Sequence, residues 1–288
     1  MVSLMSEEEM DFDPVQLMER ARAAKDAGEE EMAARAFNTA GNYYMSIGEF
    51  DEALKSFGEA LELFKSLGDT EGRGDALYNL GVAQMNNEEL EEAEQTLQSA
   101  IDMFEQASDD SGTADAMYAL ALTKLGLDEF DEAISLFRRA KRIYKDLDNM
   151  QGMASIRMDI GNAQAEQEEW DKAEREFKKA LKIYEDIDDK AGIGDALSLL
   201  GDISELQNDQ KKAAEYFAEA AENYFDAELF EITREVIERA ESKYWDIPKA
   251  TRRRLRKITD AIYDQLPEEE EDDDEDYDDD DFGDIPGI

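Results

Sequence analysis

The same classes of residue recur every 40 residues along most of this 288-residue chain. One position of the period is always small, and two others hold large apolar side chains. The small position comprises Gly41, Gly81, Ala121, Gly161 and Gly201, and the large ones comprise Phe57, Leu97, Phe137, Phe177, Phe217 and Phe64, Phe104, Tyr144, Tyr184, Tyr224. Five units in one register, with no insertion, are typical of a solenoid of stacked structural units.

Each unit is predicted to form two helices joined by a short turn. In the first unit, residues 32–47 and 51–67 carry apolar residues at helical spacing on either side of Gly48-Glu49. The positions that can cap the following helices hold Asp69, Asp109, Asn149 and Asp189. A glycine inside a helix costs about 1 kcal/mol relative to alanine, so its recurrence predicts a close approach of the two helices. We expect an all-α fold.

The register also predicts how the solenoid begins and ends. Residues 14–28 match the second helix of a unit, with Asp13 as N-cap, and residues 230–245 and 249–266 are expected as C-terminal capping helices. The solenoid then spans residues 14–266, with five repeats in residues 32–229. Residues 1–13 and the acidic run in 267–288 cannot bury a core and are expected to be disordered.

The stretch AFNTAGNYYMSIGEFDEALKSFGEAL, residues 36–61, resembles a tetratricopeptide repeat (TPR) unit in its small, aromatic and A-x-x-x-F-x-x-A positions. The usual unit has 34 residues. The 40-residue unit and the sequence GDTEGRGDALYNLG, residues 68–81, are similar to the longer units of LGN/Pins adaptors and kinesin light chains. The resemblance implies a right-handed superhelix whose concave groove is lined by the first helix of each unit. The family's late proline is absent.

The groove positions implied by this resemblance hold Asn38, Asn42, Met45, Tyr78, Asn79, Val82, Met85, Tyr118, Leu122, Met158 and Asn162. Because the centre is apolar and acidic residues flank it, we expect a protein partner: a peptide or amphipathic helical segment with apolar or basic residues. The alternative is that the tyrosine and methionine side chains simply pack against the neighbouring repeat. The cationic positions used by chaperone-binding TPR domains hold Asn38, Asp115 and Ala119, which argues against an acidic C-terminal peptide as ligand.

Composition narrows the possible functions further. Cysteine and histidine are absent, which excludes disulfides, Cys/His metal sites and catalysis by thiol or imidazole; we expect no enzyme activity, no metal and no cofactor. The net charge is −44, or −30 without the 14 acidic residues of the 268–284 segment, and such a surface repels DNA and anionic membranes. With neither an apolar span nor a secretory signal, we expect a cytoplasmic protein. Oligomeric state stays open.

Two charged segments suggest other partners. One is a cluster of six cations: Lys249, Arg252, Arg253, Arg254, Arg256 and Lys257. This cluster could bind phosphate, RNA or an acidic partner. Alternatively, it is the solvated face of a capping helix that pairs with the acidic tail. The acidic surface and tail also suit a chaperone or nucleic-acid mimic for basic proteins. The bland alternative is adaptation to high intracellular salt in a halophilic or archaeal source, although the 16 lysines fit a strongly halophilic chain poorly.

Overall fold

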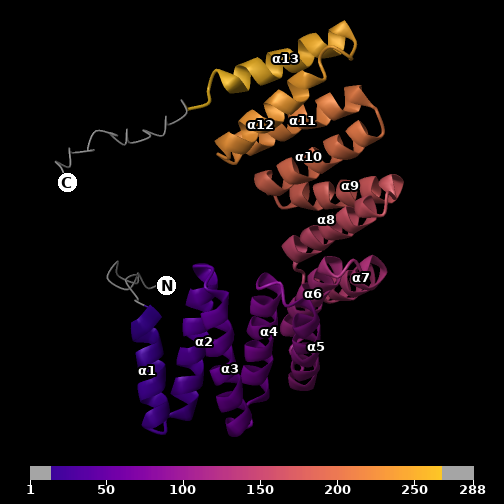
Figure 1. Ribbon diagram of the computed structural model, residues 1–288. Helices are drawn as coiled ribbons and strands as arrows, with labels where there is room; N and C mark the ends of the chain where they lie inside the picture. The colour runs from indigo at the N-terminus through magenta and orange to yellow at the C-terminus, as the bar shows by residue number, and fades with distance from the viewer. Residues whose placement is uncertain (1–13, 268–288) are drawn as a thin grey trace, which may run out of the picture.

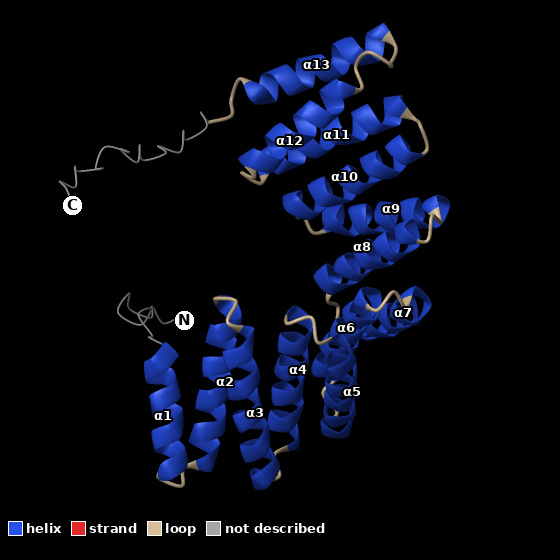
Figure 2. Cartoon of the chain, viewed as in Figure 1, coloured by secondary structure: helices blue, strands red, loops and turns tan. Residues whose placement is uncertain are grey.

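The chain folds into a series of helices, and those from the second to the twelfth begin at regular 20-residue intervals. A computed structural model describes residues 14–267 and contains only helices in that range (Figure 2). The elements are α1 (Pro14–Asp26), α2 (Glu30–Ser46), α3 (Phe50–Leu67), α4 (Thr70–Asn86), α5 (Leu90–Ala107), α6 (Asp110–Gly126), α7 (Phe130–Asp146), α8 (Met150–Glu166), α9 (Trp170–Asp186), α10 (Lys190–Leu206), α11 (Gln210–Asp226), α12 (Phe230–Ser242) and α13 (Lys249–Tyr263). Helices α2–α11 form five successive hairpins.

Local capping starts the first helix of most hairpins. The side chains of Asp69, Asp109, Asn149 and Asp189 accept hydrogen bonds from the backbone N–H three residues later, at 2.8–3.0 Å. That third residue is always glycine, and a Cβ there would collide with the aromatic ring of the preceding helix, as Gly192 would with Tyr184 at 2.4 Å. The predicted caps are therefore confirmed, and the glycines let each cap lie close to an aromatic ring.

Glycine also joins the two helices within a hairpin. A Cβ on Gly41, Gly161 or Gly201 would lie 2.4–2.5 Å from the phenylalanine ring of the second helix. These rings are among the most buried side chains of the chain, with Phe57 and Phe217 at 0% exposure. The predicted close approach of the helices is confirmed. The third hairpin has Ala121 at this position, so it accommodates a methyl group.

The hairpins stack side by side into a curved array (Figure 1). Helices α1–α5 run in one direction of the view and α8–α13 run across it, with the turn at α6 and α7. Helices α6 and α8 lie on the inner side of the bend, and α7 and α9 lie on the outer side. The first helices also contact one another along the array, α2 with α4 and α4 with α6, so they form one continuous surface that lies on the inner side of the bend at α6 and α8.

The end helices cover the first and last hairpins. Helix α1 packs Met18 and Ala21 into the core of the first hairpin, and α13 buries Leu255 and Ile262 at the other end. Both C-terminal helices are shorter than expected, because α12 ends at Ser242 before the turn to Pro248 and α13 ends at Tyr263. The expectations for Asp13 and for residues 1–12 and 268–288 lie outside the described residues. No helix in residues 14–267 is long and apolar enough to cross a membrane.

Candidate functional site

The centre of the concave surface carries partly exposed apolar side chains. Tyr78 and Val82 on α4 and Tyr118 and Leu122 on α6 are half-buried, each packed on one side against the core that runs from α4 to α8. Burial raises the pKa of the Tyr78 hydroxyl, so the ring is held in an apolar setting. These four residues pack against the neighbouring repeat and still present part of their surface.

Hydrogen bonds between neighbouring first helices fix this surface. The amide of Asn79 donates to Oδ1 of Asn38 at 3.1 Å, which ties α4 to α2. Two hairpins further along the array, the hydroxyl of Tyr118 on α6 donates to Asp159 of α8 at 2.8 Å. Both contacts join residues 41 positions apart, so they are the same inter-repeat contact made with different side chains.

Tyr118 and Asp159 form a partly buried polar pair on this surface. The ring of Tyr118 packs tilted against Phe137, with centroids 5.7 Å apart. Burial, with the nearby Asp159 carboxylate, raises the pKa of Tyr118 well above its usual range, and burial raises the pKa of Asp159 too. The sequence had not indicated Asp159; the signal was its place 41 residues after Tyr118, the offset that separates Asn38 from Asn79.

The remaining predicted groove residues divide by burial. Asn42 and Asn162 are exposed, and Met45 and Met85 are half-buried. Met158 is not presented to solvent: its side chain is 9% exposed and belongs to the core cluster of Ile193 and Leu197. The prediction that Met158 lines the surface is corrected here, because α10 covers this position with large apolar side chains.

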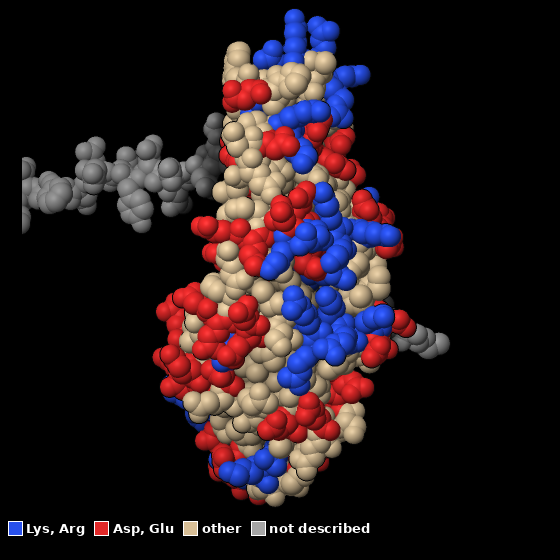
Figure 3. Space-filling view, turned by 90° about the vertical axis from the view of Figure 1, so that its right-hand side faces the viewer, with Lys and Arg blue, Asp and Glu red and all other residues tan. Residues whose placement is uncertain are grey.

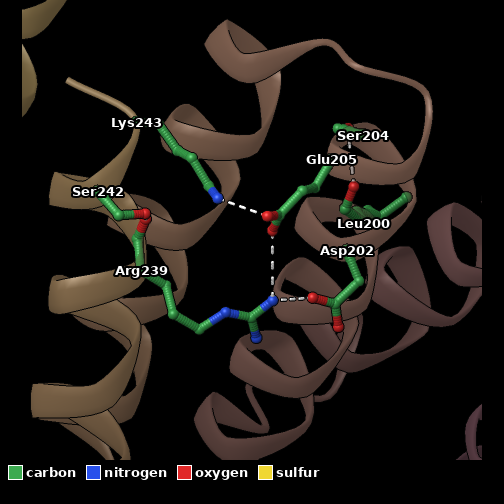
Figure 4. Close-up of polar contacts among 7 residues, drawn as sticks. All are labelled: Leu200, Asp202, Ser204, Glu205, Arg239, Ser242 and Lys243. Carbon is green, nitrogen blue, oxygen red and sulfur yellow. Dashed lines mark hydrogen bonds and ion pairs between the residues drawn. The ribbon is translucent and has the colours of Figure 1, made fainter. Parts of the chain in front are cut away.

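The acidic residues beside the surface are largely engaged within the array. Tyr144 donates its hydroxyl to Asp115, and Tyr224 donates to Asp195 at 2.8 Å, each within one hairpin. Near the C-terminal end, Arg239 of α12 pairs with Asp202 and contacts Glu205, which also binds Lys243 (Figure 4). The guanidinium of Arg239 also lies 4.1 Å from the centre of the Phe217 ring. These ion pairs therefore join α12 and the residue that follows it to α10.

Comparison with known proteins agrees with this architecture. A family model for the tetratricopeptide repeat matches residues 32–106, 72–146 and 152–224. The chain belongs to the tetratricopeptide repeat family. No curated protein matches it in sequence.

Solved structures share the TPR fold at low sequence identity. BtubC (BKLC) from P. vanneervenii has a TM-score of 0.64 and 19% identity, over 73% of this chain and 87% of that protein. Aspartyl phosphate phosphatase F from Bacillus subtilis has a TM-score of 0.65 and 19% identity, over 91% of this chain and 76% of that one. A Rap protein complexed with Competence and Sporulation Factor has a TM-score of 0.52 and 14% identity, over 88% and 76%. These likenesses concern the fold.

The predicted cationic cluster lies on α13, outside the concave surface of the TPR array. Arg254 points to the body and pairs with Glu215 at 2.7 Å. The other five, Lys249, Arg252, Arg253, Arg256 and Lys257, line one open cleft together with Trp245. Arg254 therefore holds the capping helix to the body, Arg252 and Arg256 lie close to the rings of Trp245 and Tyr244, and Lys249, Arg253 and Lys257 are exposed.

A second basic surface, which the sequence analysis missed, covers the outer side of α7 and α9 (Figure 3). Its exposed members occupy three positions that recur 40 residues apart: Arg138 and Lys178, Arg139 and Lys179, Arg142 and Lys182. Burial, with a smaller contribution from the neighbouring cation Arg157, lowers the pKa of the nearby Lys141. We call these six residues the outer basic band. The signal in the sequence was the repetition of cations at the 40-residue period.

Metal chemistry has no support in the described range. In residues 14–267, no group of three or more carboxylates is arranged to hold a metal ion. Lys124 is surrounded by Glu94, Glu129 and Glu132, but these are ion pairs that join α5, α6 and α7. The polar clusters of this array are inter-helix contacts.

Proposed function

We propose that the concave surface of this TPR array binds a segment of another protein, and that the chain acts as an interaction scaffold. The observation that carries the proposal is the row of half-exposed apolar residues on successive inner helices: Tyr78, Val82 and Met85 on α4, then Tyr118 and Leu122 on α6. Tyr78, Val82, Tyr118 and Leu122 pack on one side against the core, so little side-chain entropy is lost when a partner covers their exposed side. Family membership supports the same proposal.

Charge suggests the chemistry of the partner. Residues 14–126, which form α1–α6, contain 23 acidic and 8 basic residues, a net charge of −15. A segment with apolar residues for the row and lysine or arginine for the surroundings is complementary to this half of the array. The Rap protein structure that shares the fold was solved with Competence and Sporulation Factor bound, which supports a protein ligand for arrays of this kind.

A displayed library of random peptides tests the proposal. Peptides selected on the full chain are expected to be enriched in apolar and basic residues. Their affinity should fall at least about tenfold for the double variant Val82→Arg/Leu122→Arg, because losing the apolar contact and adding repulsion costs more than about 1.4 kcal/mol. The control is Ser99→Arg, which adds a cation at an exposed position of α5 and should leave binding unchanged. Circular dichroism verifies helicity, and the milder Tyr78→Ser serves if the double variant unfolds.

The alternative is a chaperone or nucleic-acid mimic that holds basic proteins by charge alone. The acidic excess of α1–α6 favours it. Raising salt to about 1 M, where the Debye length is about 3 Å, separates the two proposals. Binding through the apolar row should survive, whereas binding by charge alone should be lost. Selected peptides that bind the Val82→Arg/Leu122→Arg variant as tightly as the native chain would contradict the concave site.

A further inference from the structure

The solvent face of α13 holds a cluster of cations, with two carboxylates, Asp260 and Asp264, toward its C-terminal end. Lys249, Arg253 and Lys257 lie on this face, one helical turn apart, and line the open cleft beside Trp245. Within residues 14–267 none of the three forms an ion pair or side-chain hydrogen bond, whereas the neighbouring Arg254 does. In a chain of net charge −44, three neighbouring cations without an ion pair form a surface that is complementary to an anionic segment.

The position of these charges within the helix strengthens that complementarity. Negative charge stabilises the N-terminal end of a helix and positive charge destabilises it, by roughly 0.3–1 kcal/mol for exposed groups. Helix α13 begins with Lys249, has no acidic residue in its first turn, and has no side-chain cap from Pro248. Eight of the eleven helices from α2 to α12 have an acidic first turn. The charge arrangement of α13 is thus unfavourable unless an anion lies against it.

An exposed tryptophan stands at the same place. Trp245 is 83% exposed, the largest exposure of any large apolar side chain in the described range. The guanidinium of Arg252 lies 5.7 Å from the ring centre and also donates to the carbonyl oxygen of Tyr244 at 3.2 Å. Tryptophan next to arginine is the composition of energetically dominant contacts in protein interfaces. The occupant of this cleft therefore has both carboxylates and an apolar group.

The chain itself contains a segment of that composition. Residues 268–284 hold 14 acidic and no basic residues. Phe282 lies near the end of this run, and Ile285 and Ile288 follow it. We propose that the segment 268–288 lies along the solvent face of α13 of the same molecule, with its carboxylates against Lys249, Arg253 and Lys257 and Phe282 against Trp245. The segment starts next to the site, because Pro267 comes four residues after the end of α13 and its carbonyl oxygen accepts a hydrogen bond from Arg234.

The dimensions fit this arrangement. Helix α13 has 15 residues and is about 22 Å long at roughly 1.5 Å per residue. The residues from Glu268 to Asp281 span about 20 Å if they behave as a flexible chain. The segment is therefore long enough for Phe282 to reach the N-terminal end of α13, close to Trp245 in the sequence. The outer basic band is farther away, beyond the α10–α11 hairpin and α12 (Figure 1), and the local concentration of the segment there is correspondingly lower.

Tryptophan fluorescence tests the assignment on the full chain. The background carries Trp170→Phe, which leaves Trp245 as the single tryptophan. Three variants are compared with it: a neutral segment, in which every Asp and Glu of residues 268–284 becomes Asn or Gln; Lys249→Gln/Arg253→Gln/Lys257→Gln; and Phe282→Ala. The matched control is Arg138→Gln/Arg139→Gln/Lys182→Gln, which removes three cations from the outer basic band.

The expected result is protection of Trp245 from acrylamide in the native segment. A short flexible tether gives a local concentration of about 1 mM, so we expect quenching about twofold lower than in the neutral-segment variant. The α13 variant and Phe282→Ala should both lose this protection, the control should keep it, and about 1 M KCl should remove it. Equal quenching of the native and neutral segments at low salt would overturn the proposal, as would loss of protection in the control. Protection that disappears on dilution would assign the segment to a second molecule and overturn the intramolecular arrangement.

Discussion

At the scale of single residues, the array depends on glycines at which an aromatic ring of a neighbouring helix occupies the space where a Cβ would lie. Gly161 lies inside α8, and a Cβ there would approach Cε1 of Phe177 to 2.4 Å. Because a phenylalanine ring in a full core cannot bend away as a flexible side chain can, a methyl group at Gly161 requires the two helices of this hairpin to shift. Gly58 is the useful contrast, since it lies inside α3 with no atom within 4 Å of the Cβ position.

We expect Gly161→Ala and Gly58→Ala to change stability in opposite directions. Gly161→Ala should lower the free energy of unfolding by about 1–2 kcal/mol, because overpacking of about 1–3 kcal/mol exceeds the gain in helix propensity. Gly58→Ala should raise it by about 0.5–1 kcal/mol, since only the propensity changes. Urea denaturation of both variants measures the difference. A stabilised Gly161→Ala would show that the ring yields without cost.

At the scale of elements, each turn between helices from α1 to α12 has one residue with positive φ. These residues lie 20 apart, and only Gly28, Gly48 and Gly68 among them are glycine. The other eight are Glu88, Ser108, Asp128, Asp148, Glu168, Asp188, Asn208 and Glu228. A side chain in the left-handed region is strained relative to glycine, so most turns carry a local cost that the packing of the hairpins outweighs.

Replacing one of these residues with glycine should therefore stabilise the array. For Glu168→Gly (φ +58) we expect a gain of about 0.5–1 kcal/mol, because relief of strain exceeds the added chain entropy of the unfolded state. The reciprocal control is Gly68→Ala, which has free space around the Cβ position and should lose about 1–2 kcal/mol through φ alone. Thermal melts followed by circular dichroism give both values. A loss in Glu168→Gly would indicate a contact of the glutamate that outweighs the strain.

The helices and their caps were predictable from sequence because they depend on residues close together in the chain. Asp109 and Gly112 define a cap three residues apart, and Gly161 and Phe177 define a contact within one hairpin. The concave surface was less predictable, because it depends on how far each hairpin is displaced from the next. That displacement buries Met158 and places Asp159 against Tyr118. The 40-residue register does not determine how far one hairpin is displaced from the next, so neither contact could be predicted from it.

At the scale of the whole molecule, charge is unevenly distributed. Of the 31 cations, 23 lie in residues 127–267 and 8 in residues 14–126, and those of the outer basic band and α13 form local surfaces of one sign (Figure 3). Net repulsion therefore acts most strongly in the N-terminal half, where Lys25, Lys55 and Lys65 are among the few cations and are already paired at exposed sites. Exposed pairs contribute at most about 1 kcal/mol each, so they do not offset the excess.

We expect the melting temperature to rise as this repulsion is reduced, by salt and by acid separately. Raising KCl from about 50 mM to about 1 M shortens the Debye length to about 3 Å and screens the acidic half.

Lowering the pH should act in the same direction. Burial raises the folded-state pKa of Asp159, so its stabilising contribution is complete below its unfolded pKa and is lost as the pH rises through the raised value. The free energy of unfolding should therefore rise as the pH falls through the raised pKa of Asp159. The lowered pKa of Glu176, which is held by Lys179 and Arg157, acts in the opposite direction as the pH falls further. Calorimetry over a grid of salt concentrations and pH values measures the melting temperature under both changes. Asp159→Asn, which retains an acceptor for Tyr118, should reduce the pH dependence of the melting temperature and leave its salt dependence intact. A melting temperature that falls with salt would mean that the local ion pairs, rather than the net charge, control the stability of the array.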